Sequence, residues 1–430
     1  MRVLVANHCS WNKGDRAVLF VLVRELLRNG VEDITVSTAN MVYWAGQSLF
    51  PPDKVKFIPL GLDTPVSRNP RPGLMFKAFR LACKTIKCAL LFPIIRRHML
   101  KGTCPSYLCH LVSRPFWDAV TSADLVISTG GHRITTLLLP DAVGAPVYDL
   151  AVASLLKKRL VLWSQTIGPL EFQSPDNELM VQKLLANCWR IMVRDEGSID
   201  VLRATGIDMS SVSFTPESVF AANDLVPLPT PPSQRPAVVG ISVYTSGDQP
   251  TEKKQNYIET LRQFIDHLAA SGTRVLFFPM MLSGADRSCI NAIIGKVAHP
   301  EFCEVVEDFP ETPEHVAKVA QMRAFVGHKT HSVVIALAVG TPVVGIAYHR
   351  KTRDFMNQFG LGEYCVDDVG LTGGKLIEVY DRMQSDLDAV SQREQATAGE
   401  LGSKLRDGLA ELLHDARQSV VEQAPSLGRV

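Results

Sequence analysis

Short apolar runs alternate with helix-period stretches along most of the chain. Each run is followed by a loop that contains glycine or asparagine, and then by apolar residues spaced as on one face of a helix. This alternation is typical of a parallel α/β sheet, in which helices connect successive strands. The predicted strands are Arg2–Ala6, Asp33–Thr38, Asp124–Thr129, Arg159–Ser164, Arg190–Val193, Ala237–Val243, Arg274–Pro279, Ala324–Val326 and Val343–Ala347.

Two of the connecting helices carry clear signals at their ends. Asp15 is a candidate N-cap for the helix that follows Asn12-Lys13-Gly14, and Gly30 stands where this helix should end. In the second half of the chain, a helix is predicted from about Lys253 to Ala270.

A proline-rich stretch divides the two series of strands. Five prolines fall between Leu225 and Pro236, where they exclude a regular helix or a central strand. The 430 residues also exceed what a single hydrophobic core usually holds. We therefore predict an α/β fold of two Rossmann-like domains facing a cleft. Its parts are a first domain at 1–225 with a basic helical insertion at about 76–102, a linker at 226–236, a second domain at 237–373, and C-terminal helices with a tail at 374–430.

Charge and cysteine content narrow the classes of partner. The 45 lysines and arginines nearly balance the 44 aspartates and glutamates, so no nucleic-acid partner is expected and any electrostatic site must be local. The nine cysteines form no CxxC pair or short-spaced Cys/His cluster, which favours a reducing compartment and argues against structural zinc. The first residues resemble a strand and its loop rather than a signal peptide, so we expect a cytoplasmic protein.

One basic segment, Phe76–Gly102, is the part of the sequence that could contact a membrane. Its least charged part, Cys88–Ile95, is far shorter than the roughly 20 residues needed to span a bilayer. The segment is either an ordinary helical insertion packed on the protein, or an amphipathic helix pair lying peripherally at the inner membrane face. Its apolar positions are interrupted at helical spacing by Lys77, Arg80, Lys84 and Lys87.

The segment Gly327–His331 joins a predicted strand to a predicted helix. Free backbone N–H groups and the helix dipole attract an anion at such a position. Lys329 adds a positive charge, and His331 adds an imidazole, a group that ordinarily titrates near neutral pH. This combination suits a phosphorylated or carboxylated ligand with proton transfer beside it. Alternatively, His331 caps the helix or satisfies a carbonyl, and Lys329 is solvated.

Further candidate residues follow other predicted strands. Tyr348 to Lys351 form a local basic cluster that is either a solvated loop or a second wall for an anion beside Lys329. Arg194 stands at the carboxyl end of its strand, although a salt bridge with Asp195 or Glu196 would explain it equally. The remaining candidates in loops of the first half are Asn12, Gly14, Asp15, Gly130, Gly131 and Gln165.

Signatures of several other enzyme classes do not occur in the sequence. It contains no GxxxxGK[ST], HExxH or GxSxG motif, and its nearest dinucleotide-binding fingerprint fails at the glycines. NTPase, zinc protease, serine hydrolase and dehydrogenase functions therefore lose support.

The ordered set of motifs resembles the polysaccharide pyruvyl transferase family. The resemblance covers about residues 1–361 and rests on Asn12-Lys13-Gly14-Asp15, Ser128-Thr129-Gly130-Gly131, Gln165-Thr166-Ile167-Gly168-Pro169, Val193-Arg194-Asp195 with Ser198, Thr215-Pro216-Glu217, Gly327-His328-Lys329-Thr330-His331, Ala336 to Pro342, and Ile346-Ala347-Tyr348 with Lys351 and Phe355.

That resemblance implies a fold similar to the glycosyltransferase B type and transfer of pyruvyl from phosphoenolpyruvate to a sugar, usually as a cyclic ketal. It also implies that Arg194, Lys329 and His331 handle phosphoenolpyruvate. Since a histidine can act as acid and base in turn, His331 is the predicted catalytic residue. No metal or cofactor is expected, and Thr330, Tyr348 and Lys351 complete the predicted substrate-binding set.

Three positions depart from the family pattern. Lys329 stands where arginine is common, which keeps the charge but loses the two-pronged guanidinium. Glu217 stands where aspartate is frequent, and His132 replaces a third glycine. Two other functions therefore stay open: a nucleotide-sugar glycosyltransferase of the same fold, and a non-catalytic subunit of polysaccharide assembly.

Overall fold

The computed structural model divides the chain into two compact units. Unit 1 comprises Met1–Ser10, Val18–Ser218 and Lys404–Val430, and unit 2 comprises Trp11–Ala17 and Val219–Ser403. The residues described are 1–8, 12–39, 41, 44, 47–62, 73–137, 143–227, 230–244, 251–281, 284–306 and 311–423.

Unit 1 contains a parallel sheet whose order is that of a doubly wound Rossmann fold. Within the described residues the sheet has eight strands in the order β3-β2-β1-β4-β6-β7-β8, with β5 paired to β6. β4 is buried along its whole length, as expected for a central strand covered on both faces. The strands are β1 (Arg2–His8), β2 (Asp33–Thr38), β3 (Val55–Pro59), β4 (Leu125–Ser128), β5 (Gly131–Ile134), β6 (Leu160–Ile167), β7 (Arg190–Val193) and β8 (Val212–Phe214).

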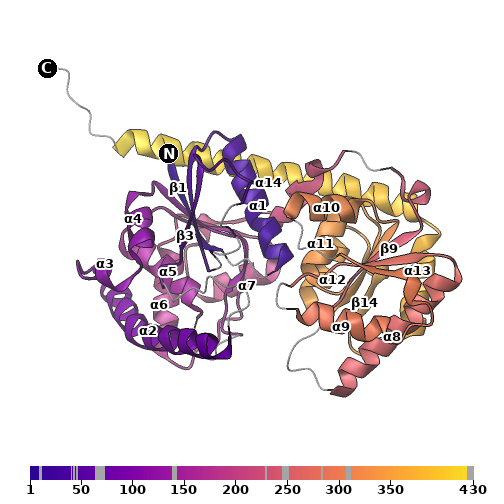
Figure 1. Cartoon of the computed structure of the whole chain (residues 1–430). Helices are drawn as coiled ribbons and strands as arrows, with labels where there is room; N and C mark the ends of the chain where they lie inside the picture. The colour runs from indigo at the N-terminus through magenta and orange to yellow at the C-terminus, as the bar shows by residue number, and fades with distance from the viewer. Residues whose placement is uncertain are drawn as a thin grey trace. The chain divides into compact units, whose positions relative to one another are not determined.

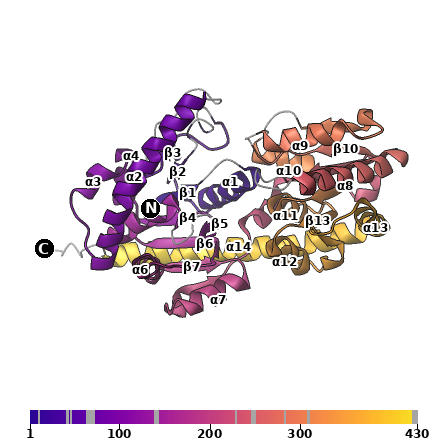
Figure 2. The ribbon, with the colours of Figure 1, turned by 90° about the horizontal axis from the view of Figure 1, so that it is seen from below.

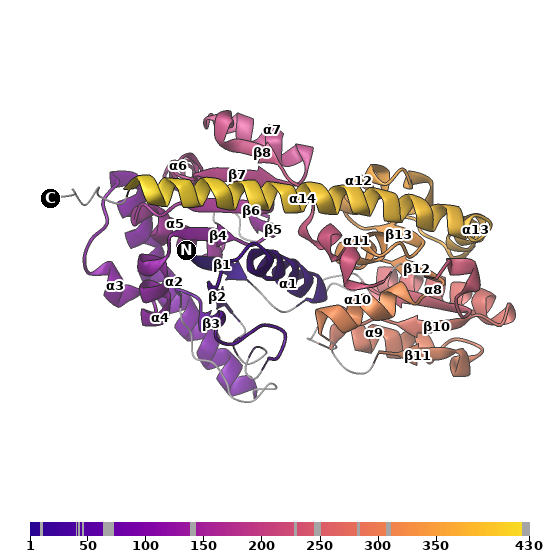
Figure 3. The same ribbon diagram turned by 90° about the horizontal axis from the view of Figure 1, so that it is seen from above.

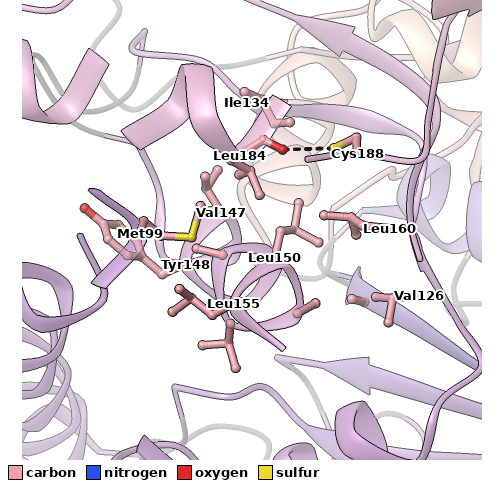
Figure 4. Packing of buried hydrophobic residues seen from close by; sticks show 14 of the residues in the cluster. Met99, Val126, Ile134, Val147, Tyr148, Leu150, Leu155, Leu160, Leu184 and Cys188 are labelled. Atoms are coloured by element: carbon pink, nitrogen blue, oxygen red, sulfur yellow. Dashed lines mark hydrogen bonds between the residues drawn. The ribbon is translucent and has the colours of Figure 1, made fainter. Parts of the chain in front are cut away.

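Helices cover both faces of this sheet (Figure 1). Figure 4 shows the core between the helices and strands, where Leu150 of α5 lies among side chains from β4, β6 and α6. At the edge of this core, the thiol of Cys188 donates to the carbonyl of Leu184 at 3.3 Å. The helices are α1 (Lys13–Arg28), α2 (Leu74–Lys101), α3 (Leu108–Leu111), α4 (Arg114–Ser122), α5 (Ala145–Leu155), α6 (Pro175–Ala186) and α7 (Glu196–Ala204).

The basic insertion forms one 28-residue helix, α2, and not a helix pair. Pro93 lies inside this helix, where its ring removes one backbone hydrogen bond without ending the helix. Packing explains the continuity, because Ile95 and Met99 are buried beyond the proline and Phe92 stacks on Tyr148 of α5 with ring centroids 3.7 Å apart.

Asp149 is a carboxyl group buried in the core of unit 1. It accepts hydrogen bonds from the backbone N–H groups of Gly61, at 3.1 Å, and of Leu62. Burial nevertheless raises the pKa of Asp149 to about 7, because these bonds only partly offset the loss of hydration. Between the ordinary pKa of an aspartate and about pH 7, Asp149 is therefore protonated in the folded protein and ionised in the unfolded chain.

Replacing Asp149 with asparagine is expected to flatten the pH dependence of stability. The stabilisation from the raised pKa is fully present below pH 4 and is lost as the pH rises through about 7. Between pH 4 and pH 8, the free energy of unfolding of wild type should therefore fall by on the order of 2–4 kcal/mol relative to that of Asp149→Asn. Urea unfolding midpoints measured across this range test the expectation. A constant difference between the two proteins would contradict it.

Unit 2 contains a second parallel sheet of the same type. Within the described residues it has six strands in the order β11-β10-β9-β12-β13-β14. Both units are therefore Rossmann-like, as the alternating sequence pattern predicts. The strands are β9 (Val238–Ser242), β10 (Arg274–Phe277), β11 (Cys303–Val305), β12 (Ala324–Gly327), β13 (Val343–Ala347) and β14 (Cys365–Asp367).

The helices of unit 2 also cover both faces of their sheet (Figure 3). The last helix, α14, is continuous through the division between the units at Ser403 and Lys404. Its first part is held to unit 2 by Ser391, whose hydroxyl donates to the carbonyl of Gly340 at 2.6 Å. In unit 1, Arg159 donates to the carbonyl of Ala416 at 3.0 Å. The helices are α8 (Thr251–Ala270), α9 (Ala285–Ile294), α10 (Thr312–Ala320), α11 (Thr330–Ala338), α12 (Arg350–Gln358), α13 (Gly373–Gln384) and α14 (Leu387–Gln423).

Candidate functional site

The turn from β12 into α11 carries the strongest sequence signal, and its lysine is buried. Lys329 is the N-cap residue of α11 and only 6% exposed. Its ammonium contacts both carboxylate oxygens of Asp286, at 2.7 and 2.8 Å. Burial lowers the pKa of Lys329, whereas the carboxylate of Asp286 opposes this shift. The alternative of a solvated Lys329 is therefore wrong.

Asp286 links three segments of unit 2. It lies in the first turn of α9, is 1% exposed, and accepts hydrogen bonds from the backbone N–H groups of Met280 at 2.8 Å and Met281 at 3.0 Å. One buried carboxylate therefore fixes both the loop after β10 and the ammonium at the start of α11. Our sequence interpretation missed this residue. Its position in the first turn of a helix after a strand-end loop is the signal that could have drawn attention to it.

The start of α1 lies with unit 2, and its N-cap is not the one expected. The side-chain oxygen of Asn12 accepts from the N–H of Gly14 at 2.7 Å, and the N–H of Lys13 donates to the carbonyl of Met280 at 3.0 Å. The helix thus begins at Lys13, and Asp15 lies in its first turn. The prediction that Asp15 caps α1 is wrong, because Asn12 satisfies the first free amide.

Gly14 lies directly against the ring of His331. A Cβ atom added at Gly14 would come within 2.2 Å of Cβ and Cγ of His331, a distance that real Cβ contacts do not reach. Only glycine lets the backbone of α1 approach the imidazole this closely. His331 is half-buried in the first turn of α11. The N-termini of α1 and α11 therefore meet at an imidazole.

Buried charges surround this junction. Lys13 is 3% exposed, and burial, together with the charge of Arg16, lowers its pKa to about 6. Arg16 forms an ion pair with Glu311 at the start of α10. The pKa of His315, a buried residue of α10, falls to about 3 because of burial and the charge of Lys13. Lys13 is thus an amine that can accept a proton near neutral pH, and the sequence interpretation did not single it out.

Three other predicted residues of unit 2 lie near this turn or on the next helix. The hydroxyl of Thr330 lies 2.7 Å from that of Thr352 and is hydrogen-bonded to Tyr348. The ring of Tyr348 stacks on Tyr244 with centroids 4.2 Å apart. Lys351 lies in the first turn of α12, where its N–H donates to Nδ1 of His349 at 3.3 Å.

The predicted residues of unit 1 form a cluster of their own at the carboxyl ends of β4, β6 and β7. Gly131 pairs with Gln165 in register, and the N–H of Arg194 donates to the carbonyl of Gln165 at 3.1 Å. The amide nitrogen of Gln165 donates to the hydroxyl of Ser128 at 3.1 Å. Gly130 packs so tightly that an added Cβ would lie 3.1 Å from the carbonyl of Ser164.

Arg194 forms a buried ion pair within this cluster. Its guanidinium binds the carboxylate of Glu217, which is 1% exposed, and donates to the hydroxyl of Thr166 at 3.0 Å. The partner is therefore neither Asp195 nor Glu196. Asp195 instead caps α7 by accepting from the N–H of Ser198 at 2.9 Å. Glu217, one of the departures from the family pattern, is thus the counterion of Arg194.

Replacing Gly14 with alanine should lower both activity and stability. The new methyl group would overlap the Cβ atom of His331, which cannot rotate away, so the start of α1 or of α11 must shift. We expect turnover to fall about 10- to 100-fold and the free energy of unfolding to fall by about 1–3 kcal/mol. Turnover and the melting temperature are the two measurements.

Gly374→Ala is the matched control for this variant. It makes the same change in the first turn of α13, where no atom lies within 4 Å of the new methyl group. Full activity in Gly14→Ala, or an equal loss in Gly374→Ala, would contradict the assignment of the contact between Gly14 and His331.

Comparison with known proteins decides the family. The sequence profile of the polysaccharide pyruvyl transferase family matches residues 12–350. This chain belongs to the polysaccharide pyruvyl transferase family. It is also similar to the amylovoran biosynthesis protein AmsJ of Erwinia amylovora, with 22% identity over 420 residues that cover 91% of this chain and 94% of that protein. Membership supports a transferase that acts in polysaccharide modification.

Solved structures agree on the fold. The UDP-GlcNAc 2-epimerase of Neisseria meningitidis, bound to UDP-GlcNAc, is similar with a TM-score of 0.58 and 13% identity, covering 96% of this chain and 100% of that one. MnaA of S. aureus with UDP gives a TM-score of 0.57 at 10% identity, covering 96% and 97%. These are proteins of the glycosyltransferase B type of architecture, which the resemblance implied for this chain. At these identities the likeness shows the fold alone.

Proposed function

We propose that this protein transfers the pyruvyl group of phosphoenolpyruvate to a sugar of a surface polysaccharide or its lipid-linked precursor, forming a pyruvate ketal. Family membership over residues 12–350 supports pyruvyl transfer. The single observation that carries the site assignment is the contact between Gly14 and the ring of His331, because it brings two helix N-termini and an imidazole together.

Pyruvyl transfer from phosphoenolpyruvate requires a site that binds an anion and a group that transfers protons. The methylene carbon of phosphoenolpyruvate takes up a proton, and the first sugar hydroxyl adds to the adjacent carbon and loses its own proton. The carbon–oxygen bond to phosphate then breaks, the second hydroxyl adds to the same carbon, and its proton leaves with the phosphate. The products are one ketal and one inorganic phosphate. His331 is assigned the proton transfers, as acid and base in turn.

The charge of phosphoenolpyruvate would be met by several groups. The free N–H groups at the starts of α1 and α11 can donate to its oxygens. Lys329 is proposed to contact the substrate through an ammonium that Asp286 orients, since the buried carboxylate holds that ammonium in place. Arg194 belongs to unit 1, where its guanidinium is paired with Glu217, and its role in handling phosphoenolpyruvate stays a prediction from the family resemblance.

The test is acceptor-dependent phosphate release. Purified protein is mixed with phosphoenolpyruvate and surface glycans or their lipid-linked precursors, and released phosphate and ketal are both quantified. We expect the two products in equal amounts and only when phosphoenolpyruvate is present. Phosphate release without ketal, or release from a nucleotide sugar alone, would contradict the proposal.

A second candidate is a nucleotide-sugar glycosyltransferase of the same fold. One observation favours it: Tyr244 and Tyr348 stack at the carboxyl ends of β9 and β13, where an aromatic base could pack. The solved relatives named above are complexes with UDP or UDP-GlcNAc. Thermal unfolding separates the candidates, because a ligand raises the melting temperature only of a protein that binds it. A shift with UDP and none with phosphoenolpyruvate would favour the glycosyltransferase.

A third candidate is a non-catalytic subunit of polysaccharide assembly. The substitution of Lys329 for arginine keeps this candidate open, since a lysine cannot form the two-pronged contact of a guanidinium. A melting-temperature shift with phosphoenolpyruvate, combined with no phosphate release on any acceptor, would support it.

A further inference from the structure

We propose that the N-terminal half of α2 docks on an anionic lipid surface. This inference is independent of the donor and acceptor proposed above, because it concerns the outer face of one helix of unit 1. No helix among the described residues is long and apolar enough to cross a membrane. The helix would therefore lie along the bilayer surface.

An exposed apolar stripe runs along this half of the helix. Met75, Phe79, Ile86 and Leu90 are 88%, 57%, 60% and 67% exposed. Their spacing of four, seven and four residues places them within about 60° of one another around the helix axis. A contiguous apolar face of this kind is unusual on a soluble protein and marks an interaction surface.

This stripe points away from the body of unit 1. In the C-terminal half of α2, Leu91, Ile95 and Met99 are all less than 7% exposed and mark the side that packs on α5 and α6. At 100° per residue, that side lies roughly opposite the apolar stripe. Figures 2 and 3 show the N-terminal half of the helix extending away from the sheet of unit 1. The stripe is therefore free to meet a flat surface.

The charge of α2 identifies the surface as anionic. The helix carries seven basic residues and no acidic residue, whereas the formal charge of the whole chain is only +1. Four of the basic residues fall in the N-terminal half, at Lys77, Arg80, Lys84 and Lys87. At 100° per residue they lie about 120–200° around the helix axis from Met75, so they form a basic stripe on the other side of the helix from the apolar one. An apolar face opposite a face rich in lysine and arginine is the pattern of helices that bind the boundary between anionic headgroups and acyl chains.

The same charge argues against a second copy of this chain as the occupant. Two α2 helices packed through their apolar stripes would place two helices of the same charge side by side, and neither helix carries an acidic residue to offset the repulsion. An anionic bilayer instead attracts the basic residues while the apolar side chains enter the boundary of the acyl region.

Vesicle co-sedimentation of the full chain tests the proposal. Vesicles of phosphatidylcholine alone are compared with vesicles that contain 30% phosphatidylglycerol, at about 0.05 M and about 0.5 M salt. We expect binding to the anionic vesicles to exceed binding to the neutral ones at least about tenfold, and to weaken in high salt. Equal binding to both vesicle types, or no binding to either, would overturn the proposal.

Two double variants separate the contributions of the two stripes. Phe79→Ser with Leu90→Ser should weaken anionic-vesicle binding about tenfold, and so should Arg80→Glu with Lys87→Glu. The matched controls make the same changes at exposed positions elsewhere, namely Phe214→Ser with Val369→Ser, and Lys296→Glu with Lys375→Glu. Circular dichroism confirms that each variant is folded.

The controls should bind as wild type does. Wild-type binding by either α2 variant, or an equal loss in its control, would overturn the proposal. Self-association through α2 without vesicle binding, measured by sedimentation velocity, would assign the stripe to a second copy instead. Because phosphate release from phosphoenolpyruvate can be assayed without vesicles, failure of this proposal leaves the proposed reaction untouched.

Discussion

Replacing His331 with asparagine is expected to reduce phosphate release from phosphoenolpyruvate by about 100- to 10,000-fold. Asparagine retains a polar planar group beside Gly14 but cannot exchange protons at the pH of the reaction. The loss should appear in kcat rather than in phosphoenolpyruvate binding, since the helix N-termini remain in place. Steady-state phosphate release over a range of phosphoenolpyruvate concentrations gives both parameters.

His267→Asn provides the matched control. His267 is a half-buried residue of α8 whose ring lies 3.0 Å from Asp381, a contact near the surface of little energetic weight. Its replacement should leave kcat within about twofold of wild type. Unchanged kcat in His331→Asn would remove the catalytic assignment of His331.

Truncating Asp286 to alanine should destabilise the protein by about 3–5 kcal/mol. The change leaves the ammonium of Lys329 buried without its counterion, and it also removes the acceptor of the N–H groups of Met280 and Met281. Urea unfolding at pH 7 measures the loss. A melting temperature equal to that of wild type would contradict the account of the buried pair.

A double variant then distinguishes a structural role of the pair between Asp286 and Lys329 from a role in binding the substrate. Asp286→Leu combined with Lys329→Met removes both charges at once, so it should recover the stability lost through the unpaired ammonium. The part lost through the N–H groups of Met280 and Met281 should remain, since leucine accepts no hydrogen bond. If Lys329 contacts phosphoenolpyruvate, the double variant should remain inactive despite its stability. Recovered turnover would show that the pair only supports the fold.

The sequence predicted the central strands of both sheets well. Strands β2, β7 and β13 have the predicted bounds, because buried parallel strands form short apolar runs between turn residues. Five strands were missed. β5 follows β4 almost directly, and β3, β8, β11 and β14 lie at the outer side of a sheet. β8, β11 and β14 are only three residues long, and β8 and β11 are exposed or half-buried, so hydrophobic periodicity is too weak to reveal them.

The candidate site was predicted only in part. Arg194, Lys329 and His331 were predicted because each follows the end of a predicted strand. The carboxylates that pair with Arg194 and Lys329 were not predicted, because they lie far away in the sequence. Glu217 is 23 residues from Arg194, and Asp286 is 43 residues from Lys329. Ion pairs between different elements depend on tertiary packing, which residue spacing in a single sequence does not encode.

The position of the first motif shows the same limit. Sequence order assigned Asn12 and Gly14 to the first domain, yet Trp11–Ala17 groups with unit 2. The bridge between Asn12 and Met281 and the contact of Gly14 with His331 account for this placement. Because the partners lie more than 260 residues away, no local pattern could have revealed them.

The central claim is that phosphoenolpyruvate binds where α1 and α11 begin. A crystal structure of the protein with phospholactate, an unreactive analogue, tests it most directly. The account predicts an anionic group of the analogue within hydrogen-bond distance of N–H groups in the first turns of α1 and α11, with the ring of His331 beside the carbon that accepts the proton. An analogue bound elsewhere, with no contact to His331 or to either helix start, would contradict the account.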